Sequence, residues 1–184
     1  LEVGSGNRTS SVVYDRANAS VTTLTMDEVN LDEIFEEAKV FVVSGITVAL
    51  NKNLKEVVIN CLKYCNEKGI KVVYDANYRS KLWSVEEAGK AFKEILPYVD
   101  ILSAGHLDAK NFLGYSNEGA SFEEVLKMDY EQMCKDYPNL KYIVSTKRDI
   151  ISTSVNDLCG FMMHKGIFTQ SATYHIDDIL DIVG

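Results

Sequence analysis

Short apolar runs alternate with amphipathic segments through the middle of the chain. Four runs rich in Val, Ile, Tyr and Leu predict buried strands: Val40–Val43, Ile70–Tyr74, Val99–Leu102 and Lys141–Val144. The segments between them carry apolar residues three and four positions apart, which predicts helices packed on one side. Strands and helices that alternate at this spacing predict a parallel sheet with right-handed crossovers.

Polar residues at the ends of the amphipathic segments predict where the helices begin and end. One helix is predicted to start near Asn53 and to end at Gly69, because glycine favours the left-handed position that closes a helix. Ser84 with Glu87 three residues later forms a capping box for the next helix. Apolar positions including Tyr130 then stripe a further helix before Pro138.

The two ends of the chain have a different pattern. From residue 150 onward, short alternating strands are predicted at 150–155, 160–164 and 167–174, with a hairpin turn at 156–157, so the sheet should have an antiparallel margin. Residues 1–25 are rich in Thr, Ser and Val and predict strand and loop. We therefore expect a β flap or lid at 1–25 and an α/β core at 26–184.

Composition and charge narrow the range of partners. The 19 basic and 27 acidic residues give a net charge of −8, and no stretch concentrates Lys and Arg, so nucleic acid and anionic membrane are not expected partners. The run Val40–Leu50 is too short to span a bilayer. The four cysteines form no Cys-x-x-Cys pair, which favours a reducing, cytoplasmic setting, and Cys61 and Cys65 lie one turn apart on an apolar stripe, as core residues do.

The candidate chemistry lies where the predicted strands end. Asp75, Asn77 and Arg79 follow the second strand directly, and ligands of open α/β sheets bind outside the carboxyl ends of the strands. Residues 44–45, 103–108 and 145–148 follow the other three strands and should share this edge. The alternative is that Asp75 caps a turn and Arg79 forms a surface ion pair.

Several of these residues also carry a resemblance to a known family. Three stretches resemble the ribokinase-like carbohydrate kinases, and among them the 2-keto-3-deoxygluconate kinases: Tyr14-Asp15-Arg16-Ala17, Ser44-Gly45-Ile46-Thr47 and Tyr74-Asp75-Ala76-Asn77-Tyr78-Arg79-Ser80-Lys81-Leu82-Trp83. The resemblance implies a three-layer α/β/α sandwich. It also implies that ATP, with Mg²⁺, phosphorylates 2-keto-3-deoxygluconate to its 6-phosphate.

The resemblance assigns the sugar to one group of residues. Tyr14 and Arg16, which lie two apart and so share one face of a strand, would contact the keto-acid sugar from the flap. Ile46 would sit beside it. Arg79 would bridge sugar and phosphate and stabilise charge in the transition state, since a guanidinium holds such oxygens in pairs. The alternative for Tyr14 and Arg16 is the solvent side of a strand.

The nucleotide is assigned to a second group of residues by the same resemblance. These are Asn77, Ser145, Thr146, Lys147, Arg148 and Gly184. Gly184 would begin an anion hole at a helix N-terminus. No residue is assigned as a direct metal ligand, and none of the three histidines is expected to be a ligand.

The sequence departs from the family pattern at two motifs that would bind magnesium and ATP. The Asn-x-x-Glu motif that organises magnesium through water corresponds here to Gly105-His106-Leu107-Asp108, which keeps the acid and lacks the Asn. The loop that holds ATP has Thr146-Lys147-Arg148 in place of a turn with glycine.

The ends of the sequence leave alternatives open. The chain begins at Leu1 and stops at Gly184, before the Gly-Asp that would carry the catalytic base, so we expect a truncated piece that is inactive alone, and an oligomer when intact. A kinase for fructose or another deoxy-ketogluconate is one alternative. A non-catalytic sugar- or nucleotide-binding fragment is another.

Overall fold

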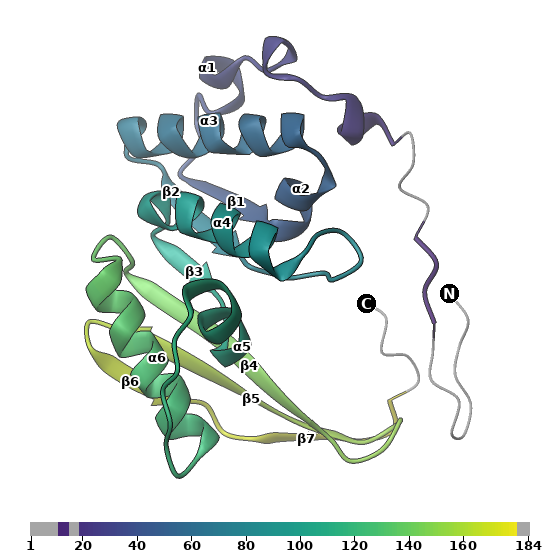
Figure 1. Ribbon diagram of the computed structural model, residues 1–184, viewed down its shortest axis with the longest axis vertical. Coiled ribbons are helices and arrows are strands. Elements are labelled where there is room, and N and C mark those ends of the chain that lie inside the picture. Colours follow the sequence, from purple (N-terminus) through teal and green to yellow (C-terminus); the bar gives the residue numbers. More distant parts are fainter. Residues whose placement is uncertain (1–10, 15–18, 180–184) are drawn as a thin grey trace.

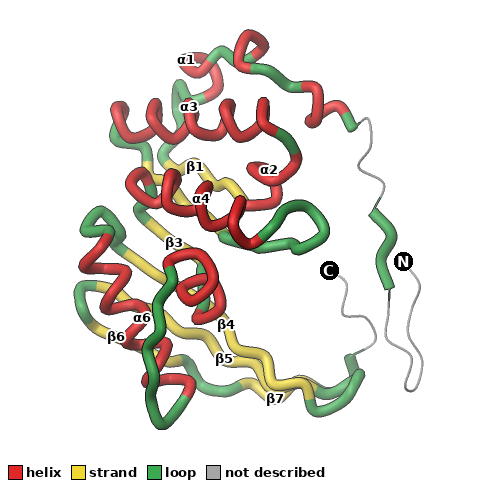
Figure 2. Tube along the Cα trace, in the orientation of Figure 1, coloured by secondary structure: helices red, strands yellow, loops and turns green. Residues whose placement is uncertain are grey.

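The structure is a computed structural model that describes residues 11–14 and 19–179. Two residues predicted to bind ligands, Arg16 and Gly184, lie outside the described residues. Figure 1 follows the chain from the helices near its start to the strands near its end, and Figure 2 separates helices, strands and loops.

The described strands form one mixed sheet. They are β1 (Val40–Ser44), β2 (Lys71–Asp75), β3 (Ile101–Ser103), β4 (Tyr142–Ile150), β5 (Asn156–His164), β6 (Ile167–Gln170) and β7 (Tyr174–Ile176). The order is β1-β2-β3-β4-β5-β6, and β7 also pairs with β5. Strands β1 to β4 are parallel, whereas β5 runs antiparallel to β4, β6 and β7. The predicted parallel sheet with an antiparallel margin is confirmed.

Along the sequence, helices alternate with the parallel strands, as the pattern of apolar residues predicted. They are α1 (Leu31–Ile34), α2 (Gly45–Leu50), α3 (Lys52–Lys68), α4 (Val85–Ile95), α5 (His106–Asp108) and α6 (Phe122–Asp136). A π-helical turn at Ala109–Leu113 continues α5, and 3₁₀ turns occupy Ser20–Thr23, Met26–Glu28 and Leu96–Tyr98. The capping box of Ser84 and Glu87 is present, and Gly69 ends α3 at φ 72°.

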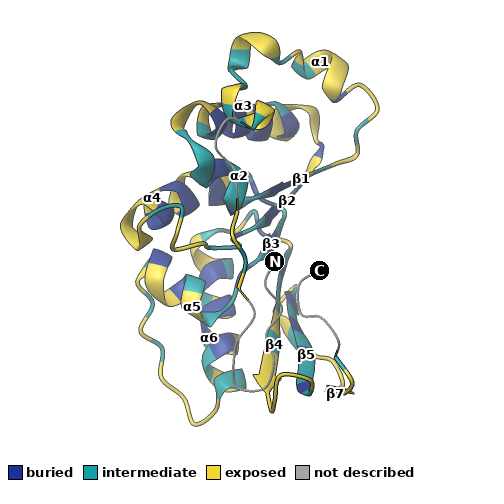
Figure 3. Cartoon of the chain, turned by 90° about the vertical axis from the view of Figure 1, so that its right-hand side faces the viewer, coloured by how far each residue is buried: buried dark blue, intermediate teal, exposed yellow. Residues whose placement is uncertain are grey.

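Helices α3, α4 and α6 cover the same face of the sheet. Tyr74 packs against Phe92 of α4, and Phe161 packs against Phe122 of α6, while α3 contacts β2 and lines a pocket together with Phe41 and Val43 of β1. Figure 3 shows α4, α5 and α6 on one side of β3, β4 and β5. The described residues therefore form two layers, a mixed sheet and one layer of helices, which are two of the three layers that the resemblance implies.

The opposite face of the sheet is apolar and lacks a helical cover within the described residues. We call it the open face. Val42 is 67% exposed there and Ile167 is 66% exposed, and the strand register places Val73, Ile101 and Tyr142 in the row between them.

A partly buried carboxylate links the amino-terminal ends of β2, β3 and β4. Asp100 accepts hydrogen bonds from Lys141 Nζ at 2.6 Å, from Lys71 Nζ at 3.4 Å and from the Val72 N–H at 3.0 Å. Burial by itself would raise the pKa of Asp100, but the hydrogen bonds from Lys141 and Val72 hold it below its usual range.

Three local predictions were wrong, whereas α3 begins at Lys52, near the predicted Asn53. Residues 44–45, predicted as a loop after the first strand, are the cap and the first residue of α2. Residues 145–148 belong to β4, which continues beyond the end of β3. The hairpin turn lies at 151–155 instead of 156–157, because the serine side chains there bond the local backbone: Ser154 N donates to Ser152 Oγ at 3.3 Å.

The division into a flap and a core stays a prediction. The described end of the first segment, residues 19–25, is attached to the core, since Asn51 Nδ2 donates to Thr22 O at 2.9 Å and Leu24 packs on the core cluster.

Candidate active site

A polar pocket of about 800 Å³ lies at the carboxyl ends of the parallel strands. The register places Ser44, Asp75 and Ser103 side by side at that edge, so the loops that follow these strands meet there. The pocket is lined by Asp75, Asn77, Tyr78, Arg79, Ser103, Ala104, Gly105, His106, Leu107, Asp108, Asn111, Phe112, Phe122, Ser145, Thr146 and Lys147. All four strand ends were predicted to converge. Residues that end or follow β2 and β3, and residues of β4 beyond its pairing with β3, line this pocket, whereas Ser44 and Gly45 do not.

The loop after β2 holds Arg79 at the rim of the pocket. Asn77 has φ 34°, an uncommon value for a residue with a Cβ that is often found at functional sites. Tyr78 packs on Phe112 with ring centroids 5.4 Å apart, and its hydroxyl donates to Trp83 O at 3.2 Å. These contacts hold the loop on both sides of an exposed guanidinium.

Two carboxylates lie on the floor of the pocket. Asp108 Oδ2 accepts a hydrogen bond from the Gly105 N–H at 2.8 Å. Burial raises the pKa of Asp108 above its ordinary value, the Gly105 hydrogen bond opposes this shift, and the nearby negative charge of Asp75 adds to it. A cation between the two carboxylates would relieve this repulsion.

Strand β4 supplies Ser145, Thr146 and Lys147 to the pocket lining. Ser145 Oγ is hydrogen-bonded to the buried Tyr130 hydroxyl at 2.7 Å, and the same hydroxyl lies 3.0 Å from Ala104 O. Lys147 Nζ lies 3.2 Å from Asp149 and 3.7 Å from Glu123. The hydrogen bond with Asp149 raises the pKa of Lys147, so this side chain is a stable positive charge.

The structure brings together some of the predicted site residues and separates others. Asn77, Arg79, Ser145, Thr146 and Lys147 line the polar pocket. Among the predicted residues that are described, Tyr14, Ile46 and Arg148 do not line it. The Ile46 N–H instead donates to Ser44 Oγ at 3.3 Å in the first turn of α2.

Sequence reasoning missed the support behind the pocket. Asp129 and Tyr130 of α6 are buried, and each forms a hydrogen bond with a residue that lines the pocket: Asp129 with His106, and Tyr130 with Ser145. Tyr130 was predicted only as a core residue. Asp129 could have been found as the one acidic side chain that interrupts the apolar stripe of Leu126, Tyr130 and Met133.

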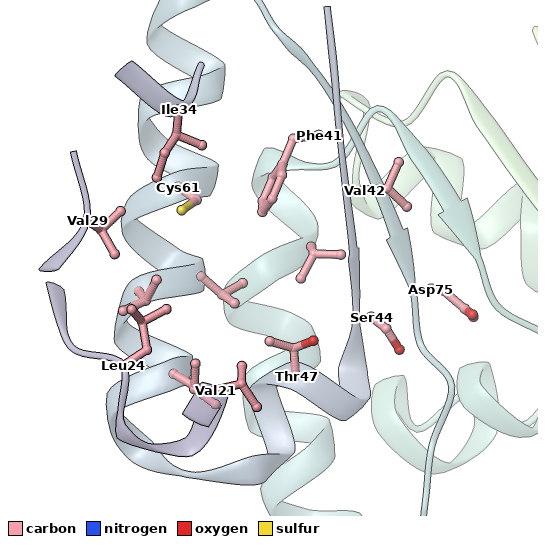
Figure 4. A pocket seen from close by; sticks show the side chains of 14 residues that line it. Val21, Leu24, Val29, Ile34, Phe41, Val42, Ser44, Thr47, Cys61 and Asp75 are labelled. Carbon is pink, nitrogen blue, oxygen red and sulfur yellow. The ribbon is translucent and has the colours of Figure 1, made fainter. Parts of the chain in front are cut away.

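A second pocket, of about 560 Å³, lies between β1, α3 and the 3₁₀ turns. Figure 4 shows Val21, Leu24 and Val29 facing Phe41 across it, with Ser44 and Asp75 at one end. Its lining is mostly aliphatic, so it offers few groups that could fix a charged ligand. The polar pocket is the better candidate for chemistry.

Two further findings concern metals and membranes. Residues 11–14 and 19–179 contain no group of three or more His, Cys, Asp and Glu side chains arranged to hold a metal ion. In the same ranges, no helix is both long enough and apolar enough to cross a membrane.

Comparison with known proteins gives consistent matches. The family described as pfkB family carbohydrate kinase matches residues 1–135. The chain is 38% identical over 131 residues to a 2-dehydro-3-deoxygalactonokinase of Haloferax volcanii, covering 71% of this chain and 41% of that protein.

Solved structures match nearly the whole chain. A pfkB family carbohydrate kinase from Listeria grayi has a TM-score of 0.90 and 36% identity, covering 98% of this chain and 54% of that one. A 2-dehydro-3-deoxygluconokinase from Thermotoga maritima has a TM-score of 0.89 and 36% identity, covering 97% of this chain and 54% of that one. The chain thus spans about half the length of the relatives that it matches.

Proposed function

Because this chain belongs to the pfkB family of carbohydrate kinases, we propose that the protein transfers the γ-phosphoryl group of ATP to 2-keto-3-deoxygluconate and forms its 6-phosphate. The relatives named above act, by their names, on this sugar acid or on its galactonate isomer. The observation that carries the proposal is the polar pocket at the carboxyl ends of the strands, whose lining includes both the guanidinium of Arg79 and the ammonium of Lys147.

In this proposal Arg79 anchors the sugar acid and steadies the transferred phosphoryl group. A guanidinium binds carboxylate or phosphate oxygens in pairs, and phosphoryl transfer depends mainly on positioning and charge stabilisation. Ser145, Thr146 and Lys147, together with Asn77, would contact the nucleotide. Tyr14, Ile46 and Arg148 remain proposed ligand contacts although they do not line the pocket. Arg16 and Gly184, which lie outside the described residues, also remain proposed contacts.

The pocket residues fit magnesium as well as ATP. Asp75 and Asp108 offer the oxygen ligands that Mg²⁺ prefers. Burial raises the pKa of Asp108 and the charge of Asp75 adds to this shift, so a cation near both carboxylates would favour their ionised forms. We propose that these two carboxylates hold the ion through water. When bound, it would neutralise charge on the phosphates.

The test is a coupled assay of ADP formation with the protein in its natural full length. The sugars compared are 2-keto-3-deoxygluconate, its galactonate isomer and fructose, beside a reaction without sugar. We expect turnover with a keto-acid sugar only. Fructose as the preferred substrate would indicate the related-kinase alternative, and no ADP with any sugar would favour a binding protein.

Two Arg79 variants test the anchor residue. Arg79→Ala should lower kcat/KM by about 10- to 100-fold, the equivalent of one charged hydrogen bond of about 1.5–3 kcal/mol. Arg79→Lys should recover only part of this, because an ammonium cannot bind two oxygens in one plane. Lys93→Ala, which removes an exposed cation of α4 outside the pocket, is the control and should behave as wild type.

A second candidate substrate has specific support. The Haloferax volcanii relative is named for the galactonate isomer of the same sugar acid. The two isomers share the carboxylate that Arg79 would hold, so the ratio of their kcat/KM values decides between them.

A further inference from the structure

The loop after β2 carries Arg79 into the lining of the polar pocket. In the part of the chain that the structure describes, its guanidinium is exposed and has no hydrogen-bond or ion-pair partner. Two residues earlier, Asn77 has φ 34°, a conformation that persists only where surrounding contacts impose it. The place of the guanidinium in the pocket therefore depends on what holds the backbone of this loop.

Tyr78 holds the loop at two points. Its ring packs edge-on against Phe112, with centroids 5.4 Å apart and the ring planes at 67°. Its hydroxyl donates a hydrogen bond to the Trp83 carbonyl at 3.2 Å. Within the loop, the Leu82 N–H donates to the Arg79 carbonyl at 2.9 Å. The loop is thus closed into a turn that contains Arg79.

Phe112 gives Tyr78 a rigid partner. It is 4% exposed and belongs to the π-helical turn Ala109–Leu113, a conformation found frequently at functional sites. Its ring centroid lies 5.4 Å from that of Phe92 in α4. Its backbone is also close to α4, since a Cβ placed on Gly89 would lie 3.3 Å from Phe112 Cα. A ring held at both its backbone and its side chain can fix the loop that packs on it.

We propose that Tyr78 and Phe112 are positioning residues, which act through Arg79 and place its guanidinium against an anionic group of the bound ligand. That this ligand is a sugar acid rests on the proposed function. The alternative is that Tyr78, which also lines the pocket, contacts the ligand by itself. The two cases differ, because a residue that acts only through Arg79 has nothing left to contribute once Arg79 is removed.

The kinetic test is a double-mutant cycle in the natural full-length protein, with Tyr78→Leu, Arg79→Ala and both together. Tyr78→Leu should lower kcat/KM for the sugar acid about tenfold or more, because a small misplacement of a binding group has an effect of that size. In the Arg79→Ala background, the same substitution should change kcat/KM by less than about twofold. Losses that multiply, or a Tyr78→Leu variant that equals the wild type, would overturn the proposal.

Two further variants separate the ring from the hydroxyl. Tyr78→Phe keeps the ring pair with Phe112 and should retain more activity than Tyr78→Leu. Phe112→Leu removes the ring partner and should repeat the pattern of Tyr78→Leu, including its dependence on Arg79. If Tyr78→Leu does not fold in urea titrations, Phe112→Leu takes its place in the cycle.

The chain contains a matched control. Tyr64 of α3 also stacks on a phenylalanine, with its ring centroid 5.6 Å from that of Phe35, and its hydroxyl donates to Asp32 at 2.6 Å. It does not line the polar pocket. Tyr64→Leu should therefore leave kcat/KM unchanged, both in the wild type and in the Arg79→Ala background.

Two measurements keep the inference independent of kinase activity. Hydrogen exchange at the Leu82 amide should be about tenfold or more faster in Tyr78→Leu and unchanged in Tyr64→Leu. In calorimetric titrations, the Kd of inorganic phosphate should rise in Tyr78→Leu and in Arg79→Ala, with no further rise when the two are combined.

The outcomes distinguish the inference from the proposed function. If no sugar is phosphorylated but both of these results are obtained, the proposed function fails and the inference stands. If exchange at Leu82 is unchanged in Tyr78→Leu, or if the wild type binds neither inorganic phosphate nor 2-keto-3-deoxygluconate, the inference fails whatever the activity.

Discussion

Gly45 is the position where a single methyl group should do most damage to the pocket. It is the first residue of α2, where the chain passes β2 very closely. A Cβ placed on Gly45 would lie 2.2 Å from Ala76 O and 3.1 Å from both Ala76 C and Tyr74 Oη. Two of these three atoms belong to the backbone, so they cannot move aside as the end of a flexible side chain could.

Two opposing effects decide the stability of Gly45→Ala. Alanine is favoured over glycine within a helix by about 1 kcal/mol. Against this, a carbon and an oxygen need about 1 Å more than the available 2.2 Å, and forcing extra atoms into a packed site costs typically about 1–3 kcal/mol, occasionally more. Because the 2.2 Å contact is with a backbone atom, the cost should reach the upper end of that range, and the net loss should be about 2 kcal/mol.

The same substitution should reach the ligand. The displaced Ala76 leads into Asn77 and Arg79, so the KM of the anionic substrate should rise together with the loss of stability. The assay is urea unfolding at an unchanged m-value, combined with the ADP assay. Gly160→Ala is the control, because the nearest atoms to its Cβ would be 3.8 Å away. If the Gly45→Ala variant is as stable as the wild type, the argument from the close approach of Gly45 to Ala76 is refuted.

Four further predictions follow from the fold and the site. The pKa of Asp100 is held below its usual range in the folded protein. The contribution of Asp100 to the unfolding free energy is therefore present above about pH 4, and it is lost as the pH falls through the pKa that Asp100 has in the folded state. Asp100→Asn should remove that acid-side slope from urea titrations. Asp75→Asn should lower the raised pKa of Asp108 towards its ordinary range in a ¹³C carboxyl titration. Because a carboxyl whose pKa is raised on folding loses stability as the pH rises above about 4, the variant should show a smaller loss of unfolding free energy over that pH range. Tyr130→Phe should cost about 1–2 kcal/mol in urea unfolding and raise the KM for ATP, since Ser145 loses its support. The isolated 184-residue chain should self-associate through its open face and the edge of β1, which has no partner strand among the described residues. A monomer in sedimentation velocity at all concentrations would contradict this.

The regular part of the fold could be predicted because its signals are local. Apolar runs, capping boxes and the terminal Gly69 each depend on neighbours within a few residues, and they agree with the structure. The convergence of the strand ends followed from topology alone, since parallel strands present their carboxyl ends at one edge.

Helix α2 could not be predicted because tertiary contact overrides its local preference. Ile46, Thr47 and Val48 are β-branched and continue an apolar run, which favours a strand. Their helical conformation depends instead on the Ser44 cap and on the close approach of Gly45 to Ala76. Strand β4 presents the reverse case, because the polar residues 145–148 stay extended through pairing with β5.

Helix α6 links the hydrophobic core to the chemistry of the pocket. Asp129 and Tyr130 are consecutive and buried, and each bonds a residue on a different wall: His106 after β3 and Ser145 on β4. An apolar stripe alone would have sufficed to pack this helix, and a buried carboxylate is not needed for stability. The polar pair therefore makes most sense as a support that holds two pocket residues in fixed orientations. For this reason, substitutions at these two core positions should change ligand binding by more than their effect on unfolding alone would explain.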